Sequence, residues 1–108
     1  MKHMNKIFAL VLALVMICAC MTACSSKDVT VESVQKAGKL VIATSPDFPP
    51  FESLEGGEVV GIEVDIMELI CQELGVELVI EQMNFDSVLP GVQAGKFDLG
   101  ASGISVTP

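Results

Sequence analysis

The sequence contains no arginine, tryptophan or tyrosine, and His3 is its only histidine. Acidic residues outnumber basic residues 14 to 6, which gives a formal net charge of −8. Because nucleic-acid binding needs clustered Lys and Arg side chains on the phosphates, no nucleic-acid partner is expected. The single histidine and the spacing of the four cysteines fit no zinc-ligand pattern, so neither a metal site nor a cofactor is expected.

The N-terminal region carries most of the hydrophobicity of the chain. Lys2 and Lys6 precede an uninterrupted apolar run from Ile7 to Met21, shorter than the ~20 residues of a membrane-spanning helix. A charged start, a short apolar stretch and a small residue before a break are typical of a secretory signal peptide. Polar residues follow at 25–28, which favours this interpretation over a buried core helix or a short membrane anchor.

The cysteines of this region predict a lipid anchor rather than disulfides. The segment "MTACSSK" resembles the lipobox of bacterial lipoproteins, in which a peptidase cuts after a small residue and the following cysteine carries lipid. Ala23 is that small residue and Cys24 the predicted lipidation site, with Cys20 after Ala19 as the alternative. Residues 1–23 are therefore predicted as a lipoprotein signal peptide, and 24–38 as the lipidated cysteine, a tether and a short helix.

The remainder of the chain alternates between helical and strand-like patterns. Apolar spacing, capping residues and glycine stops predict the element bounds. The expected order is a helix at 31–37, a buried strand at 39–44, an irregular loop at 45–58, a brief extended piece at 59–60, a well-buried amphipathic helix at 61–75, a strand at 76–82, a short helix capped by Asp86 or Ser87, and a strand at 97–101.

This alternation predicts a parallel sheet with helices on its faces. Right-handed crossovers place the first strand between the second and the third. Ligands of such sheets bind at the carboxyl ends of the strands, where the loops 45–52 and 100–108 emerge. Within the second helix, Cys71 stands among apolar residues and is expected to be a core thiol.

Three ordered segments carry a resemblance to a known family. They are KLVIATSPDFPPFE from residue 39, GEVVGIEVDIMELICQELGV from residue 57, and VLPGVQAGKFDLGASGISVTP from residue 88. Together they resemble the N-terminal lobe of solute-binding protein family 3 of ABC importers. The resemblance implies an α/β fold, a periplasmic-binding-protein-like lobe with a mostly parallel three-layer sheet. Residues 39–108 would be the N-terminal part of lobe 1, truncated before the second lobe.

The resemblance also implies a function. The protein would be the extracytoplasmic substrate-binding component of an ABC importer for a polar amino acid, and not an enzyme. Its partners would be the free amino acid or a similar small polar solute, an ABC permease, and membrane lipid through the lipidated cysteine. It would be exported and anchored by lipid to the outer face of the cell membrane, or lie in the periplasm.

Site residues follow from the resemblance position by position. Phe48 would cover the ligand side chain, and Ser102, Gly103 and Ser105 would meet the backbone of a bound amino acid. Backbone N–H groups in such a loop suit a carboxylate.

Three further candidates lie in the first loop: Ser45, Phe51 and Glu52. Phe51 would either support Phe48 or be a core residue. Glu52 and Asp47 are interpreted as solvated loop acids.

Two alternatives share the fold, which does not determine function by itself. One is a dehydratase or a domain of a murein-cleaving enzyme, but catalysis needs a proton-transfer group at the cleft and no His or Tyr follows residue 23. The other is the sensory domain of a membrane kinase, which the lipobox disfavours. Family members continue past Pro108 to a ligand-binding Arg, so we expect residues 24–108 alone to show no saturable binding.

Overall fold

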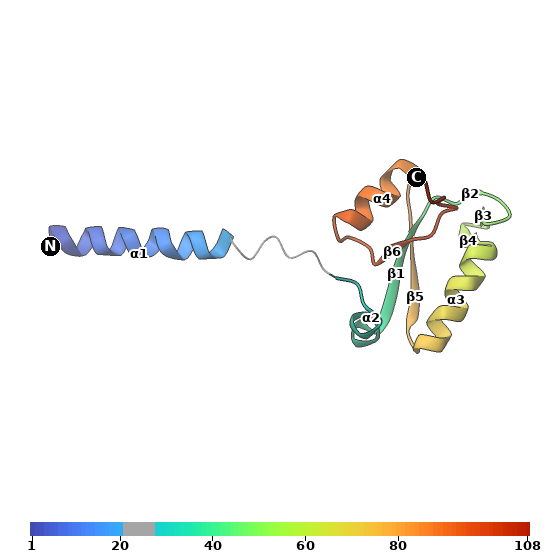
Figure 1. Cartoon of the computed structure of the whole chain (residues 1–108), viewed down its shortest axis with the longest axis horizontal. Helices are drawn as coiled ribbons and strands as arrows, with labels where there is room; N and C mark the ends of the chain where they lie inside the picture. The colour runs from blue at the N-terminus through green and yellow to red at the C-terminus, as the bar shows by residue number, and fades with distance from the viewer. Residues whose placement is uncertain (21–27) are drawn as a thin grey trace.

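The computed structural model describes residues 1–20 and 28–108 (Figure 1). Helix α1 (Lys2–Cys20) takes in most of the apolar run, and none of the helices in the described ranges has the length and apolarity to cross a membrane. Cys24, the predicted lipidation site, lies outside the described residues, and Cys20 ends α1. The other helices are α2 (Val31–Ala37), α3 (Ile62–Leu74) and α4 (Phe85–Gln93).

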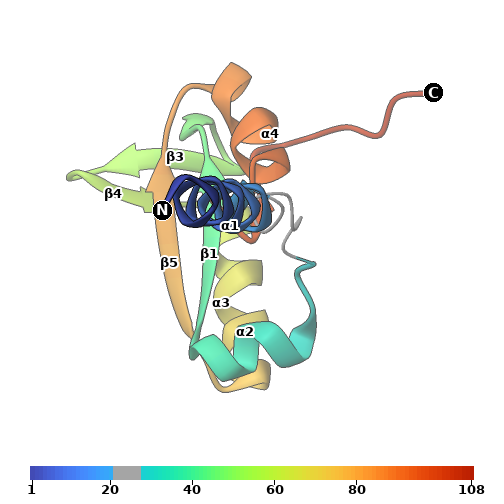
Figure 2. The same cartoon turned by 90° about the vertical axis from the view of Figure 1, so that its left-hand side faces the viewer.

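The main sheet has three parallel strands, with β1 (Lys39–Thr44) at its centre. β5 (Glu77–Gln82) pairs along the whole of β1, and β6 (Leu99–Gly100) pairs on its other side with Ile42 opposite Leu99. Figure 2 shows β1 and β5 side by side. The order β5-β1-β6 confirms the predicted topology, with the first strand in the middle.

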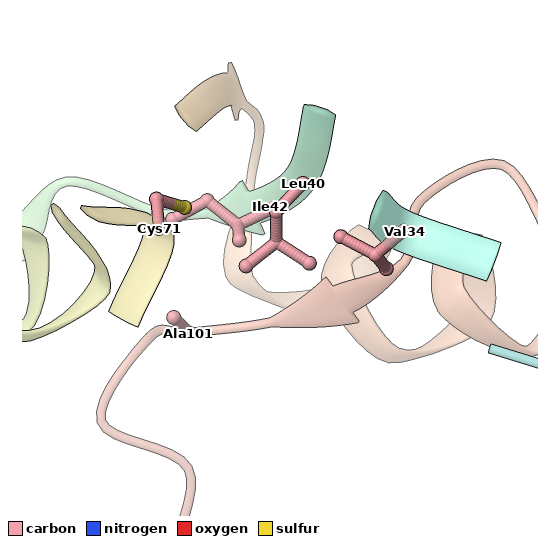
Figure 3. Close-up of a cluster of buried hydrophobic side chains, with 5 residues drawn as sticks. All are labelled: Val34, Leu40, Ile42, Cys71 and Ala101. Atoms are coloured by element: carbon pink, nitrogen blue, oxygen red, sulfur yellow. The ribbon is translucent and has the colours of Figure 1, made fainter. Parts of the chain in front are cut away.

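Helices cover the sheet as the alternating pattern requires. α3 packs on β5, α4 packs on β1 and β6, and Figure 1 shows these two helices on opposite sides of the sheet. The buried apolar cluster in Figure 3 joins α2, β1, α3 and the residue after β6. Its members are Val34, Leu40, Ile42, Cys71 and Ala101. The prediction of a core thiol is thus confirmed, and burial followed by the charge of Glu68 raises the pKa of Cys71.

Two details of the helices differ from the sequence-based expectation. α4 begins at Phe85 with Asn84 as its N-cap, so the predicted caps Asp86 and Ser87 lie inside the first turn. α3 is less buried than predicted, because only Val64 and Cys71 are fully buried. Four of its large apolar side chains remain exposed: Ile62, Ile66, Leu69 and Ile70.

The segment expected to be an irregular loop forms a second, antiparallel sheet. Its strands are β2 (Asp47–Phe48), β3 (Glu52–Glu55) and β4 (Glu58–Val60), in the order β2-β3-β4. The expected extended piece at 59–60 is part of β4. Gly56 and Gly57 both have positive φ between the paired residues Glu55 and Glu58, the geometry of a two-residue hairpin turn. The Gly-Gly pair is a sequence signal for this hairpin turn, but the three prolines nearby favoured an irregular loop instead.

Candidate functional site

Two phenylalanines lie in the loop that leaves the carboxyl end of β1. Phe48 is 54% exposed and Phe51 is 40% exposed, and their rings stack with centroids 5.4 Å apart and planes 21° apart. Such stacking holds one ring in place against the other. The interpretation of Phe51 as a core residue is therefore wrong, whereas its role in supporting Phe48 against a ligand stays a prediction, which the stacking favours.

The loop after β6 is tied to the loop after β1 by a buried serine pair. The Ser45 N–H donates to the Ser102 hydroxyl oxygen at 2.9 Å, and that hydroxyl lies 3.3 Å from the Ser45 carbonyl. Both residues are buried at the adjacent ends of two parallel strands. Ser45 and Ser102 therefore hold the two loops in contact.

Gly103 is the point at which the second loop meets the rest of the site. Its N–H points at the Glu63 carboxylate, with distances of 3.1 Å to Oε1 and 3.0 Å to Oε2. A Cβ atom at this position would lie 3.0 Å from the Phe48 ring, so the loop backbone packs directly against that ring. The structure thus brings Phe48 and Gly103 together from segments far apart in the sequence.

Glu52 is the least expected part of the site. Its side chain is only 1% exposed, so its interpretation as a solvated loop acid is wrong, whereas Asp47 is exposed as predicted. Its Oε1 lies 3.5 Å from the Ser102 hydroxyl, and its Oε2 is buried without a hydrogen-bond partner among the described residues. Burial, the neighbouring Glu63 carboxyl and the charge of Asp47 together raise the pKa of Glu52 from 4.5 to about 7.

The reason for the burial of Glu52 is the second sheet. As the first residue of β3 it pairs with Phe48 across the sheet, which puts its carboxyl at the junction of the two loops. The prolines and glycines of this segment favour an irregular loop, in which nothing predicts that Glu52 is buried.

Glu63 is a site residue that was not predicted from the sequence. An acid in the first turn of a helix is normally explained by the helix dipole alone, so nothing local points to Gly103, which is 40 residues away.

Ser105 lies farther along the second loop and is exposed. Direct ligand contact by Phe48, Ser102, Gly103 and Ser105 stays a prediction. Within the described ranges, no cluster of His, Cys, Asp or Glu suits a metal ion.

Comparison with known proteins finds chains of similar sequence and fold, several of them named as arginine-binding. The "Arginine-binding extracellular protein ArtP" of Bacillus subtilis (strain 168) is 34% identical over 99 residues, which is 88% of this chain and 38% of that protein. The arginine-bound form of domain 1 from TmArgBP of T. maritima is 39% identical with a TM-score of 0.67, over 69% of this chain and 60% of that one.

A third similar protein is an amino acid ABC transporter substrate-binding protein from Streptococcus pneumoniae Canada MDR_19A, solved bound to L-arginine. It is 51% identical with a TM-score of 0.67, over 71% of this chain and 34% of that chain. This chain therefore spans less than two thirds of each of these three proteins. Residues 40–108, well over half of the chain, match the family model for bacterial extracellular solute-binding proteins, family 3, and the chain belongs to that family.

Proposed function

We propose that this protein supplies the lobe-1 binding surface of the substrate-binding component of an ABC importer, and that its ligand is arginine or a similar cationic amino acid. The observation that carries the proposal is the contact between the Phe48 ring and the Gly103 backbone at the ends of two parallel strands. Several of the similar proteins are named for arginine. The protein would bind and release its ligand without altering it, and deliver it to a permease.

The chemistry of the site suits a cationic amino acid. An exposed aromatic face attracts a guanidinium group, which favours a role for Phe48 in covering the ligand side chain. Glu63 contacts Gly103, which lies against the Phe48 ring, and Asp47 precedes Phe48 in the chain, so both add negative charge near the ring, and the sequence contains no arginine to oppose it. In this proposal Ser105 and the Gly103 carbonyl hold the amino-acid end of the ligand, because the Gly103 N–H already donates to Glu63, and Ser102 also contributes to this contact.

Whether one lobe binds alone is open to direct test. The TmArgBP structure is described as the arginine-bound form of domain 1, so in that relative a single domain holds the ligand. This weighs against the expectation that residues 24–108 show no saturable binding. We therefore expect weak but saturable binding of L-arginine by the full chain in calorimetry.

A matched pair of variants tests the site. Phe48→Ala should weaken L-arginine binding about tenfold, or about 1.4 kcal/mol, because it removes the exposed ring. Phe85→Ala removes a similarly exposed ring from α4 and should leave the affinity unchanged. Equal losses in the two variants, or no binding by a chain that circular dichroism shows to be folded, would contradict the proposal.

We also propose that the protein is exported and anchored through Cys24, on the strength of the "MTACSSK" segment. Two or three acyl chains anchor a protein stably. Expressed in bacteria supplied with labelled fatty acid, the chain should take up label, and Cys24→Ala should abolish it. Label that survives Cys24→Ala and disappears in Cys20→Ala would assign the anchor to Cys20.

A further inference from the structure

An open groove of about 510 Å³ runs along one side of α4. Its apolar lining comes from Met83, Pro90, Ala94 and Phe97. Two charged residues, Asp86 and Lys96, complete most of the remainder. None of the lining residues belongs to the candidate ligand site, so the groove is a second surface feature that the proposed function does not use.

The two charges of the groove lie at its opposite ends. Asp86 stands in the first turn of α4, and Lys96 follows the helix, where its N–H donates to the Gly91 carbonyl. The eight residues from Asp86 to Ala94 alone rise about 12 Å along a helix axis. Both charged residues are exposed, and neither side chain forms an ion pair in the part of the chain that the structure describes. Both charges are therefore available to a partner.

The middle of the groove is open to a close approach. Gly91, midway between Asp86 and Lys96 in the sequence, is buried, and a Cβ there would lie 2.5 Å from Cε2 of Phe97. The Phe97 ring therefore packs directly on the helix backbone. Small side chains stand beside this contact, among them Ser87 and Ala94. Because the side chains at a contact set the distance between two helices, another helix can come near α4 here.

The charge pattern of the groove matches a second copy of the same chain. Residues 83–97 contain one acid and one base, whereas the chain as a whole has a net charge of −8 and α3 carries four acids and no base. This face is therefore electrically balanced on an acidic protein. A surface with an acid at one end and a base at the other is complementary to itself after a half-turn. A purely basic or purely acidic partner would match only one end.

We propose that two copies of the chain associate through their α4 grooves in an antiparallel, two-fold symmetric contact, in which Asp86 of each copy pairs with Lys96 of the other. The two-fold axis passes near Gly91. The apolar lining loses contact with water in this arrangement. Exposed ion pairs contribute little affinity, so the two pairs chiefly fix the orientation of the copies. The proposal does not rest on the proposed function, because no ligand-site residue takes part.

Cross-linking tests the contact directly. Isotope-labelled and unlabelled full-length chains, solubilised in detergent, are mixed and treated with a water-soluble carbodiimide, which joins a carboxylate to an adjacent amine without a spacer. We expect mass spectrometry to find the Asp86 peptide joined to the Lys96 peptide with one labelled and one unlabelled partner. Absence of this link, or linked peptides that always carry the same label, would overturn the proposal.

Charge reversal tests the symmetry of the contact. Asp86→Lys and Lys96→Asp each place like charges opposite one another, so each should weaken self-association about tenfold in sedimentation at a series of concentrations. An equal mixture of the two variants restores both pairs between unlike copies, and so does the double variant within one chain. Both should regain the association of the unmodified chain. A general loss of folding is not rescued by mixing two impaired chains.

The matched control is Glu55→Lys, which makes the same change of charge at an exposed position of β3 and should leave self-association unchanged. Association that Asp86→Lys does not weaken would mean that the copies meet elsewhere, for example through α1, and would overturn the proposal. A mixture that stays as weak as the single variants would contradict the antiparallel pairing. A chain that remains monomeric throughout the concentration series would leave the groove to a partner other than a second copy, which also overturns the proposal.

Discussion

The two loops at the carboxyl edge of the sheet are built in opposite ways. The loop after β1 folds on itself into β2, β3 and β4 and satisfies its backbone largely within its own segment. The loop after β6 contains no strand or helix in residues 101–108 and is held by Ser45, Glu63 and the Phe48 ring. One loop is a scaffold, and the other takes its conformation from that scaffold. Substitutions in the first should therefore disturb both, and substitutions in the second should remain local.

The largest effect is expected at Gly61, where the scaffold loop enters α3. Its φ is +139°, and a Cβ there would lie 2.3 Å from the Phe51 carbonyl oxygen. Because the clash is with backbone, Gly61→Ala should lower the free energy of unfolding by about 3 kcal/mol or more. Urea denaturation followed by circular dichroism measures the loss.

Gly75→Ala is the control for Gly61→Ala. Gly75 also has positive φ, +71°, but a Cβ there meets open space, so the cost should be about 1 to 2 kcal/mol. Equal destabilisation by the two substitutions would show that the loop after β1 tolerates displacement of its backbone. That loop would then not be the rigid scaffold on which the loop after β6 depends.

The next effect is the dependence of stability on pH. The pKa of Glu52 rises from 4.5 to about 7 on folding, so the native state binds more protons than the unfolded state between these values. The free energy of unfolding should therefore fall as pH rises through this window, by about 3 kcal/mol in total from this group.

Glu52→Gln should remove this contribution, whereas Glu55→Gln, at an exposed position on the same strand, should retain it. Urea midpoints at a series of pH values give the comparison. A stability profile that is unchanged in Glu52→Gln would mean that the buried carboxyl is not neutral in the folded protein.

A smaller effect is expected from the serines of the second loop. Ser102→Ala leaves the buried Ser45 N–H without its acceptor, which should cost about 1 to 3 kcal/mol. Ser105→Ala is at an exposed position and should change stability by less than about 0.5 kcal/mol while it weakens arginine binding. Thermal unfolding measures the change in stability of each variant, and calorimetry measures its affinity for L-arginine. A stable Ser102→Ala protein would contradict the serine pair as the link between the loops.

The elements whose signals are local could be predicted from the sequence. The apolar spacing of Val31, Val34 and Ala37 and the stop at Gly38 predicted α2, and the β-branched run of residues 39–44 predicted β1. The strand order followed from the alternation of helices and strands and from the handedness of crossovers. Phe48 was identified through the family resemblance, and the structure adds its contact with Gly103.

The parts that could not be predicted depend on pairings between distant residues. Glu63 and Gly103 are 40 residues apart, and Glu52 and Ser102 are 50 apart. Neither acid differs in its local sequence from a solvated one. The burial of Glu52 follows only once β3 is placed against β2, and the prolines beside it argued against any strand in that segment.

The buried thiol of Cys71 is a chemical probe of how often the core opens. A thiolate is the reactive form of cysteine, and both burial and a raised pKa keep Cys71 from forming it. A thiol-directed alkylating reagent can therefore modify Cys71 only when α3 moves away from the sheet and opens the buried cluster. The rate of that modification, read by mass spectrometry of the peptide that contains Cys71, reports how often the core opens under native conditions.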